Sequence, residues 1–106
     1  MISIFDITMI RKFFLGFMRI HILYHASKGS ICGVEMMEEL ERHGYSTSPG
    51  LIYPLLHSLE EVGYLKSEQR PIHGKMRKYY EATPKGLRML EKSRKQIREL
   101  VEEVME

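Results

Sequence analysis

The sequence has one cysteine, no tryptophan and a formal net charge of only +2 in 106 residues. A single cysteine, Cys32, excludes a disulfide bond within the chain and a zinc site built from several of its own thiolates. It is typical of a protein of the reducing cytoplasm that keeps a small, semi-buried thiol. The weak net charge does not identify a partner, so the positions of the charged residues carry more information than their sum.

A long hydrophobic run is also missing. Asp6, Arg11, Lys12 and Arg19 interrupt the apolar N-terminal stretch well short of the roughly 20 apolar residues that span a membrane. This stretch also lacks the basic start and the small-residue cleavage site of a signal peptide. We therefore expect a soluble, cytoplasmic protein with no membrane partner, and the length predicts one domain with one modest core.

The stretch SPGLIYPLLHSLEEVGYL, residues 48–65, predicts a helix with one buried face. Ser48 is suited to cap this helix, Pro49 suits its first position, and Gly63 provides a left-handed stop. Its apolar stripe at helical spacing consists of Ile52, Leu55, Leu56 and Leu59. The opposite face is small, aromatic or polar and has no Lys, which indicates a surface that meets a partner.

The residues before this helix predict a second, shorter one. GVEMMEELERHG, residues 33–44, has apolar residues on one side and glutamates on the other, and a very short strand is expected at Ser30 and Ile31. Only three residues separate Gly44, at the expected end of this helix, from the cap at Ser48. Two short helices joined by so tight a turn are typical of a helix-turn-helix.

A basic hairpin is predicted after the central helix. YLKSEQR and RKYYEAT are two strand-like runs, and we expect residues 71–76 to form a loop between them. Residues 66–78 contain five basic residues and one acidic residue. The basic charge of the chain is therefore concentrated just after the central helix.

The two ends of the chain predict helices with more apolar surface than one small core can cover. Residues 1–28 read mostly as helix, clearest from Thr8, with apolar side chains over more than half of its circumference. Thr83 and Pro84 begin a helix with a short heptad seam that runs to the C-terminus. A second copy of the chain is the simplest partner, although the first helix could instead thread through the core. The predicted dimer contacts are Phe13, Phe14, Phe17, Leu90, Ile97, Val101 and Val104.

The order helix, short strand, helix, turn, helix, basic hairpin, helix predicts a mostly α (α+β) winged helix-turn-helix. Residues 1–83 would form the DNA-binding domain with a two-stranded wing, and residues 84–106 the C-terminal dimerisation helix. A helix fits the major groove of DNA, and a basic hairpin can lie along the flanking backbone or minor groove. The sequence contains no nucleophile–base pair and no phosphate-binding Gly-rich loop, so we do not expect an enzyme.

The chain also resembles a known family on three motifs. SPGLIYPLLHSLEEVGYL, the upstream GVEMMEEL, and RKYYEATPKGLRML are similar to the PadR family of transcriptional regulators, in order and spacing, from about Ile20 to Leu90. The resemblance implies a dimeric repressor on palindromic double-stranded DNA, released by a small molecule, with dimerisation through both terminal helices. The C-terminal part is a single helix, as in the short branch of the family.

The resemblance also implies DNA contacts by Ser48, Gly50 and Tyr53, with Lys75 and Arg77 in the wing. The full set of predicted DNA contacts is Thr47, Ser48, Gly50, Leu51, Tyr53, His57, Arg70, His73, Lys75, Arg77 and Lys78. Leu51 stands where family members usually have Thr, and Ser58 where they often have Arg, which leaves the preferred DNA sequence open. Without tryptophan, an effector site built on that residue cannot be carried over, and we expect a small hydrophobic or aromatic effector.

Four alternatives remain open from the sequence. Pro54 either kinks the central helix or shows that the regular helix begins a turn later. His21 and His25 are four residues apart, but without further ligands we predict no metal site and no cofactor. The methionines and phenylalanines either line an effector pocket or are ordinary packing. Finally, the fold could be a winged-helix module that docks on an acidic protein.

Overall fold

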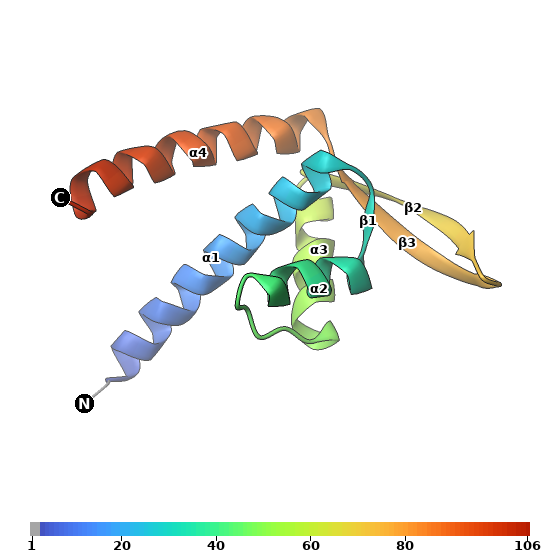
Figure 1. Ribbon diagram of the computed structural model, residues 1–106, viewed down its shortest axis with the longest axis horizontal. Helices are drawn as coiled ribbons and strands as arrows, with labels where there is room; N and C mark the ends of the chain where they lie inside the picture. The colour runs from blue at the N-terminus through green and yellow to red at the C-terminus, as the bar shows by residue number, and fades with distance from the viewer. Residues whose placement is uncertain (1–2) are drawn as a thin grey trace.

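The computed structural model describes residues 3–106. Its helices and strands in chain order are α1 (Ile4–Lys28), β1 (Ile31–Cys32), α2 (Gly33–Arg42), α3 (Pro49–Glu61), β2 (Leu65–Ile72), β3 (Lys75–Ala82) and α4 (Pro84–Val104). The helices with one small antiparallel sheet, whose β2–β3 hairpin projects to one side, form a winged helix-turn-helix, which confirms the predicted fold class (Figure 1). Residues 1–2, which the predicted first helix included, lie outside the described residues.

The wing is longer, and its turn tighter, than the sequence predicts. The strand order is β1-β3-β2, and β2 pairs with β3 from Leu65↔Ala82 to Ile72↔Lys75. Only His73 and Gly74 connect the strands, both with positive φ (49° and 77°), as in the primed turns that match the twist of a hairpin. The predicted loop over residues 71–76 is therefore wrong. Pro71 is tolerated inside β2 because β2 is an edge strand.

The core lies where α1, α2 and α3 pack against the sheet. The largest fully buried side chains are Ile22, Met36, Leu40, Ile52, Leu56 and Leu65. All four residues of the predicted apolar stripe of α3 are buried. The core thus fixes one face of α3 and leaves the other to solvent.

The ends of α3 follow the sequence signals, with one difference. Ser48 occupies the N-cap position, but its hydroxyl makes no capping bond; its main-chain carbonyl accepts from the N–H groups of Leu51 and Ile52, both at 3.0 Å. The helix starts at Pro49 and includes Pro54, so the interpretation that it starts a turn later is wrong. Gly63 ends it with φ 84° and a hydrogen bond to the Glu60 carbonyl at 3.0 Å, part of a Schellman motif.

The start of α4 is locked onto the end of α3. The Thr83 hydroxyl accepts from the Gly86 N–H at 3.0 Å and donates to the Gly63 carbonyl at 2.5 Å. A Cβ at Gly86 would lie 2.1 Å from the carbonyl oxygen of Tyr64, so only glycine allows this approach. The predicted cap at Thr83 is therefore confirmed, and it also joins two helices.

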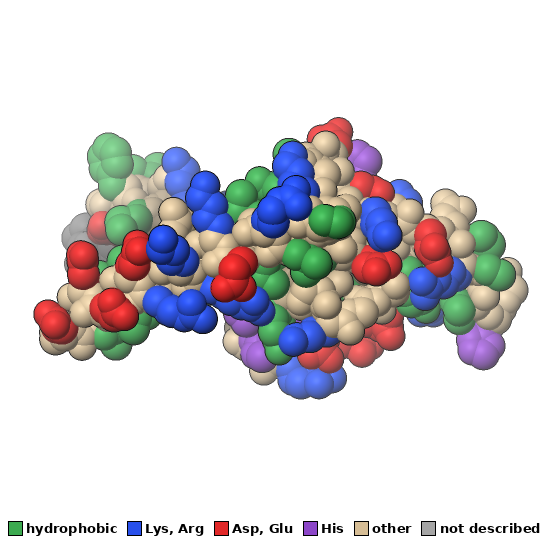
Figure 2. All heavy atoms as spheres, turned by 90° about the horizontal axis from the view of Figure 1, so that it is seen from above, with side chains coloured by type: hydrophobic (Ala, Val, Ile, Leu, Met, Phe, Trp, Pro, Cys, Tyr) green, Lys and Arg blue, Asp and Glu red, His purple; other side chains and the backbone are tan. Residues whose placement is uncertain are grey.

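The outer halves of α1 and α4 leave the core on the same side and diverge (Figure 1). Phe5 and Val104 are 83% and 66% exposed, and hydrophobic side chains are visible at this end of the molecule (Figure 2). Leu90 differs from the other predicted dimer contacts because it is buried in the core of its own chain. Over residues 3–106, no helix combines the length and the apolar character needed to cross a membrane.

Candidate nucleic-acid interface

One face of α3 is open to solvent along the first two turns. Gly50, Tyr53, Pro54 and His57 are exposed, and their spacing puts them on one side of the helix. His57 lies 3.8 Å from Glu61 of the next turn. Leu51 is half-buried and packs against the core, so it does not lie on the exposed face with the other predicted DNA contacts of this helix. Gly50 adds no side chain at the start of this face.

Tyr53 is held by a close contact that the sequence does not reveal. A Cβ built on Gly33, the first residue of α2, would lie 2.6–2.7 Å from three atoms of the Tyr53 ring and hydroxyl. The ring therefore rests on the backbone at the start of α2, yet Tyr53 remains 42% exposed. Gly33 is buried, and its missing side chain leaves the space that the tyrosine ring occupies.

The two hydroxyls predicted to contact DNA just before α3 differ in their partners. The Thr47 hydroxyl donates to the Glu41 carboxylate at 3.0 Å, which ties the turn back to α2. The exposed Ser48 hydroxyl, in contrast, does not cap its helix. Of these two predicted contacts, Ser48 is therefore the one with a hydroxyl ready for an outside acceptor.

The basic residues of the wing divide between its two faces. Because side chains alternate along a strand, Lys75 and Arg77 share a face with Arg70, whereas Lys78 lies on the face of the buried Tyr80. Arg70 and Arg77 are directly opposite each other, an arrangement of like charges that destabilises a sheet. The positive charges of the wing therefore do not stabilise its hairpin, which suggests that they serve another purpose.

Arg70 already has partners within the chain. Its Nε donates to the Glu68 carboxylate at 2.6 Å, its Nη2 donates to the Ser30 hydroxyl at 3.2 Å, and its guanidinium lies 4.8 Å from the centre of the Tyr79 ring. It serves the structure of the wing as well as its charge. Within residues 3–106, no ion pair engages the side chains of the other basic residues predicted to contact DNA, which are exposed: Lys75, Arg77 and Lys78.

The charge of Arg77 is felt at the start of α2. The Glu35 carboxylate accepts from the Cys32 N–H at 3.1 Å, which lowers the pKa of Glu35, and the positive charge of Arg77 lowers it further. Tyr53 of α3 rests on the same end of α2. One predicted contact of the central helix, Tyr53, thus touches the start of α2, and one of the wing, Arg77, acts on it through its charge. His73 lies at the exposed tip of the wing.

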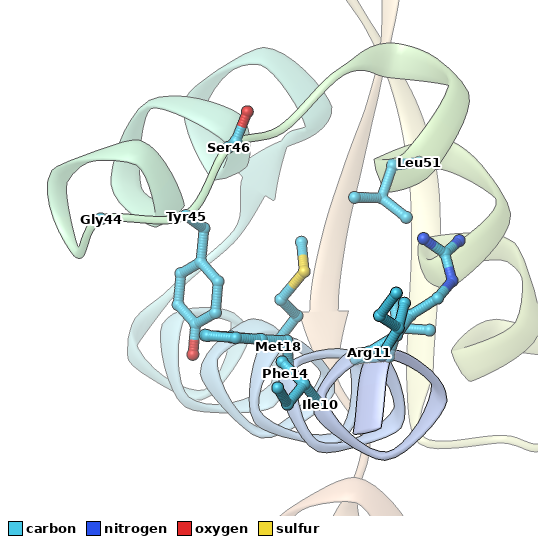
Figure 3. Close-up of a pocket in the computed structure, with 10 residues that line it drawn as sticks. Ile10, Arg11, Phe14, Met18, Gly44, Tyr45, Ser46 and Leu51 are labelled. Carbon is cyan, nitrogen blue, oxygen red and sulfur yellow. The ribbon is translucent and has the colours of Figure 1, made fainter. Parts of the chain in front are cut away.

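A pocket of about 510 Å³ separates α1 from the turn and the first residues of α3. In Figure 3, Leu51 and Arg11 lie on one side of it and Tyr45 on the other, with Met18 between them. Phe14 meets the Tyr45 ring edge-on, with 6.4 Å between ring centres. The sequence gives no sign that Tyr45 and Leu51 share a pocket with α1, because their contact depends on the crossing of helices far apart in the chain.

Comparisons with known proteins agree with this geometry. A family model described as "Transcriptional regulator PadR-like family" matches residues 22–92. Transcriptional regulator Rv3488 of Mycobacterium tuberculosis is 45% identical over 95 residues, which are 90% of this chain and 89% of that protein. The X-ray structure of a PadR-like transcription factor from Bacteroides fragilis is similar with a TM-score of 0.81 and 26% identity, covering 92% of this chain and 95% of that one. A PadR-like transcriptional regulator from Bacillus cereus has a TM-score of 0.72 and 31% identity, covering 86% and 93% of the two chains.

Proposed function

The chain belongs to the transcriptional regulator PadR-like family, and from this premise we propose that it is a cytoplasmic, homodimeric repressor that binds a palindromic double-stranded DNA operator. As a member of this family it regulates transcription and is not an enzyme. The proposal concerns its finer properties: the DNA contacts, the dimer and the release from DNA.

The observation that carries the proposal is the exposed face of α3 next to an exposed basic wing. The first turn of α3 has no side chain at Gly50 and a free hydroxyl at Ser48, so a phosphate can approach its N–H groups closely. Tyr53, which is 42% exposed and rests on the backbone at Gly33, adds a hydroxyl. Lys75 and Arg77 add two cations for the backbone of the flanking DNA.

The dimer is supported by apolar surface that one chain leaves exposed. On α1, Ile7, Met9 and Phe13 are 57%, 74% and 51% exposed, and on α4 Val101 is 50% exposed. Soluble monomers rarely expose a continuous apolar surface of this kind. We therefore assign the outer halves of α1 and α4 to the dimer interface, with Phe13, Phe14, Phe17, Ile97, Val101 and Val104 as contacts.

Release by a small hydrophobic or aromatic effector is supported by the pocket between α1 and α3. Its lining is mainly apolar, and Leu51 belongs to the helix that we assign to the major groove. A ligand that enlarges this pocket would therefore move the first turn of α3 relative to α1. Because Leu51 lines this pocket, we assign it to the effector response. Its predicted contact with a DNA base stays a proposal.

The experiment that tests DNA binding measures affinity for an operator duplex at several salt concentrations. The double variant Lys75→Ala/Arg77→Ala removes up to four phosphate contacts from a dimer. The negative slope of log K against log salt should therefore become shallower by about 3 to 4. The control Lys92→Ala/Lys95→Ala removes the same charge from exposed positions of α4 and should leave the slope nearly unchanged.

An unchanged slope in the wing variant would contradict the assignment of Lys75 and Arg77. If the wild-type chain binds no duplex even at low salt, the alternative of a winged-helix module that docks on an acidic protein is favoured instead. The test therefore separates a wrong contact from a wrong function.

A further inference from the structure

Three histidines from two helices meet on the side of the molecule where α1 crosses the end of α2. His21 and His25 are one turn apart on α1, and His43 is the residue that ends α2. Their ring centres are 4.9 Å (His21 to His43), 5.7 Å (His25 to His43) and 6.4 Å (His21 to His25) apart. Each ring offers one nitrogen that lies within 4.8 Å of the nitrogens of the other two.

One ring nitrogen of these three histidines lacks the partner that a buried atom needs. The Nε2 atom of His25 is buried and has no hydrogen-bond partner among residues 3–106. Buried polar side-chain atoms are hydrogen-bonded in the large majority of cases, because an unpaired one loses its solvation without compensation. An unpaired ring nitrogen on a histidine that has two other histidines beside it is consistent with a ligand from outside the chain.

From this geometry we propose that His21, His25 and His43 bind a divalent transition-metal ion of the zinc class. Neutral imidazole nitrogens suit zinc, copper, nickel and cobalt, whereas calcium and magnesium require oxygen ligands that this cluster does not supply. Tetrahedral zinc with bonds of 2.0–2.1 Å places its ligand atoms about 3.3 Å apart. The nitrogens, which lie within 4.8 Å of one another, must therefore approach by up to about 1.5 Å. Exposed His43 has the freedom to make this movement.

The surroundings favour the metal-binding, neutral form of the two rings on α1. Burial lowers the pKa of His21 and of His25, and the neighbouring His43 lowers the pKa of both further. The carboxylate of Glu39 acts in the opposite direction on His25, but Glu39 pairs with Arg42 at 3.2 Å. A neutral ring keeps a nitrogen lone pair for the ion near pH 7. A fourth position remains for water or an exchangeable ligand.

The sequence alone predicts no metal site here, because it shows only the pair on α1. His43 is 18 positions further on than His25, and only the crossing of α1 and α2 brings it to the pair. Since His43 directly precedes the turn that leads to α3, a bound ion would fix this turn to α1. That consequence for DNA affinity rests on the proposed function, whereas the metal site does not.

The test uses the intact chain without an affinity tag, freed of metal by a chelator and titrated with zinc in a calorimeter at about pH 7.5. We expect one ion per chain. The variant His43→Gln should weaken binding by at least about tenfold, the lower end of the effect seen when even an outer-shell partner of a metal site is lost. The control variant His57→Gln/His73→Gln removes the two histidines outside the cluster and should bind zinc like the wild-type chain.

Cobalt provides a second readout that does not depend on DNA. Co²⁺ bound in a tetrahedral site gives intense visible absorption, which we expect for the wild-type chain and the control and not for His43→Gln. If His43→Gln unfolds, as judged by circular dichroism, His21→Gln takes its place. Equal zinc affinity in the cluster variants and the wild-type chain, or loss of binding in the control, would overturn the proposal. Operator affinity with and without zinc is a separate measurement, and its failure would count against the proposed coupling but not against the site.

Discussion

The substitution Gly33→Ala should weaken operator binding without unfolding the chain, although Gly33 itself is buried and not part of the predicted DNA contacts. The added methyl group would lie 2.6–2.7 Å from the Tyr53 ring, about 1 Å closer than ordinary contact allows. The tyrosine is the flexible partner and must move. The proposed hydrogen bond from its hydroxyl to a phosphate would then be lost.

The size of this effect follows from the kind of bond. A hydrogen bond to a charged group contributes about 1.5 to 3 kcal/mol, so its loss should weaken binding by about tenfold or more for each protomer. The stability of the fold should change little, because alanine is the better helix former by up to about 1 kcal/mol and offsets part of the strain at Tyr53. The assay combines fluorescence anisotropy on an operator duplex with thermal unfolding.

Two further variants make the result decisive. Gly16→Ala is the matched control, because a Cβ on this glycine of α1 would meet no described atom within 4 Å apart from its chain neighbours and the backbone of its own helix. In a Tyr53→Phe background, which already lacks the hydroxyl, Gly33→Ala should cost little further affinity, as expected for two changes that act through one group. Full operator affinity of Gly33→Ala, or the same additional loss in the Tyr53→Phe background, would refute the reasoning.

Three other outcomes follow from the structure. Gly86→Ala should destabilise the fold by about 1 to 3 kcal/mol, because its methyl group meets the Tyr64 carbonyl at 2.1 Å; an unchanged urea midpoint would contradict this. Phe13→Glu should shift the chain to monomer in analytical ultracentrifugation, and a persistent dimer would exclude Phe13 from the interface. Burial lowers the pKa of His21 and His25, so the unfolded chain takes up protons first as the pH falls through the ordinary value of 6.5. The melting temperature of the metal-free chain should therefore decrease as the pH is lowered from about 7.5 to 5.5. An increase would contradict the lowered pKa values of these two histidines.

The sequence predicts those parts of the fold that depend on local signals. The cap position at Ser48, the buried stripe of α3 and the stop at Gly63 all lie within one stretch, and each acts on its neighbours along the chain. Thr83 and Pro84 predict the start of α4 for the same reason. Such features need no knowledge of which distant segments pack together.

The parts that could not be predicted depend on tertiary contacts or on an unusual backbone conformation. The wing turn escaped prediction because His73 adopts a positive φ, which non-glycine residues seldom do, and because Pro71 suggested a loop. The contact of Gly33 with Tyr53 joins two helices, and so does the approach of His43 to His21. A single sequence does not show which of these residues will meet.

The central claim is that α3 and the wing read DNA as a pair of related half-sites. Selection of bound duplexes from a random pool by the intact chain tests it most directly. We predict enrichment of an inverted repeat whose half-site centres are about 34 Å apart, one helical turn, or a multiple of that spacing. Recovery of duplexes without any shared sequence, or of scattered single half-sites, would contradict the claim.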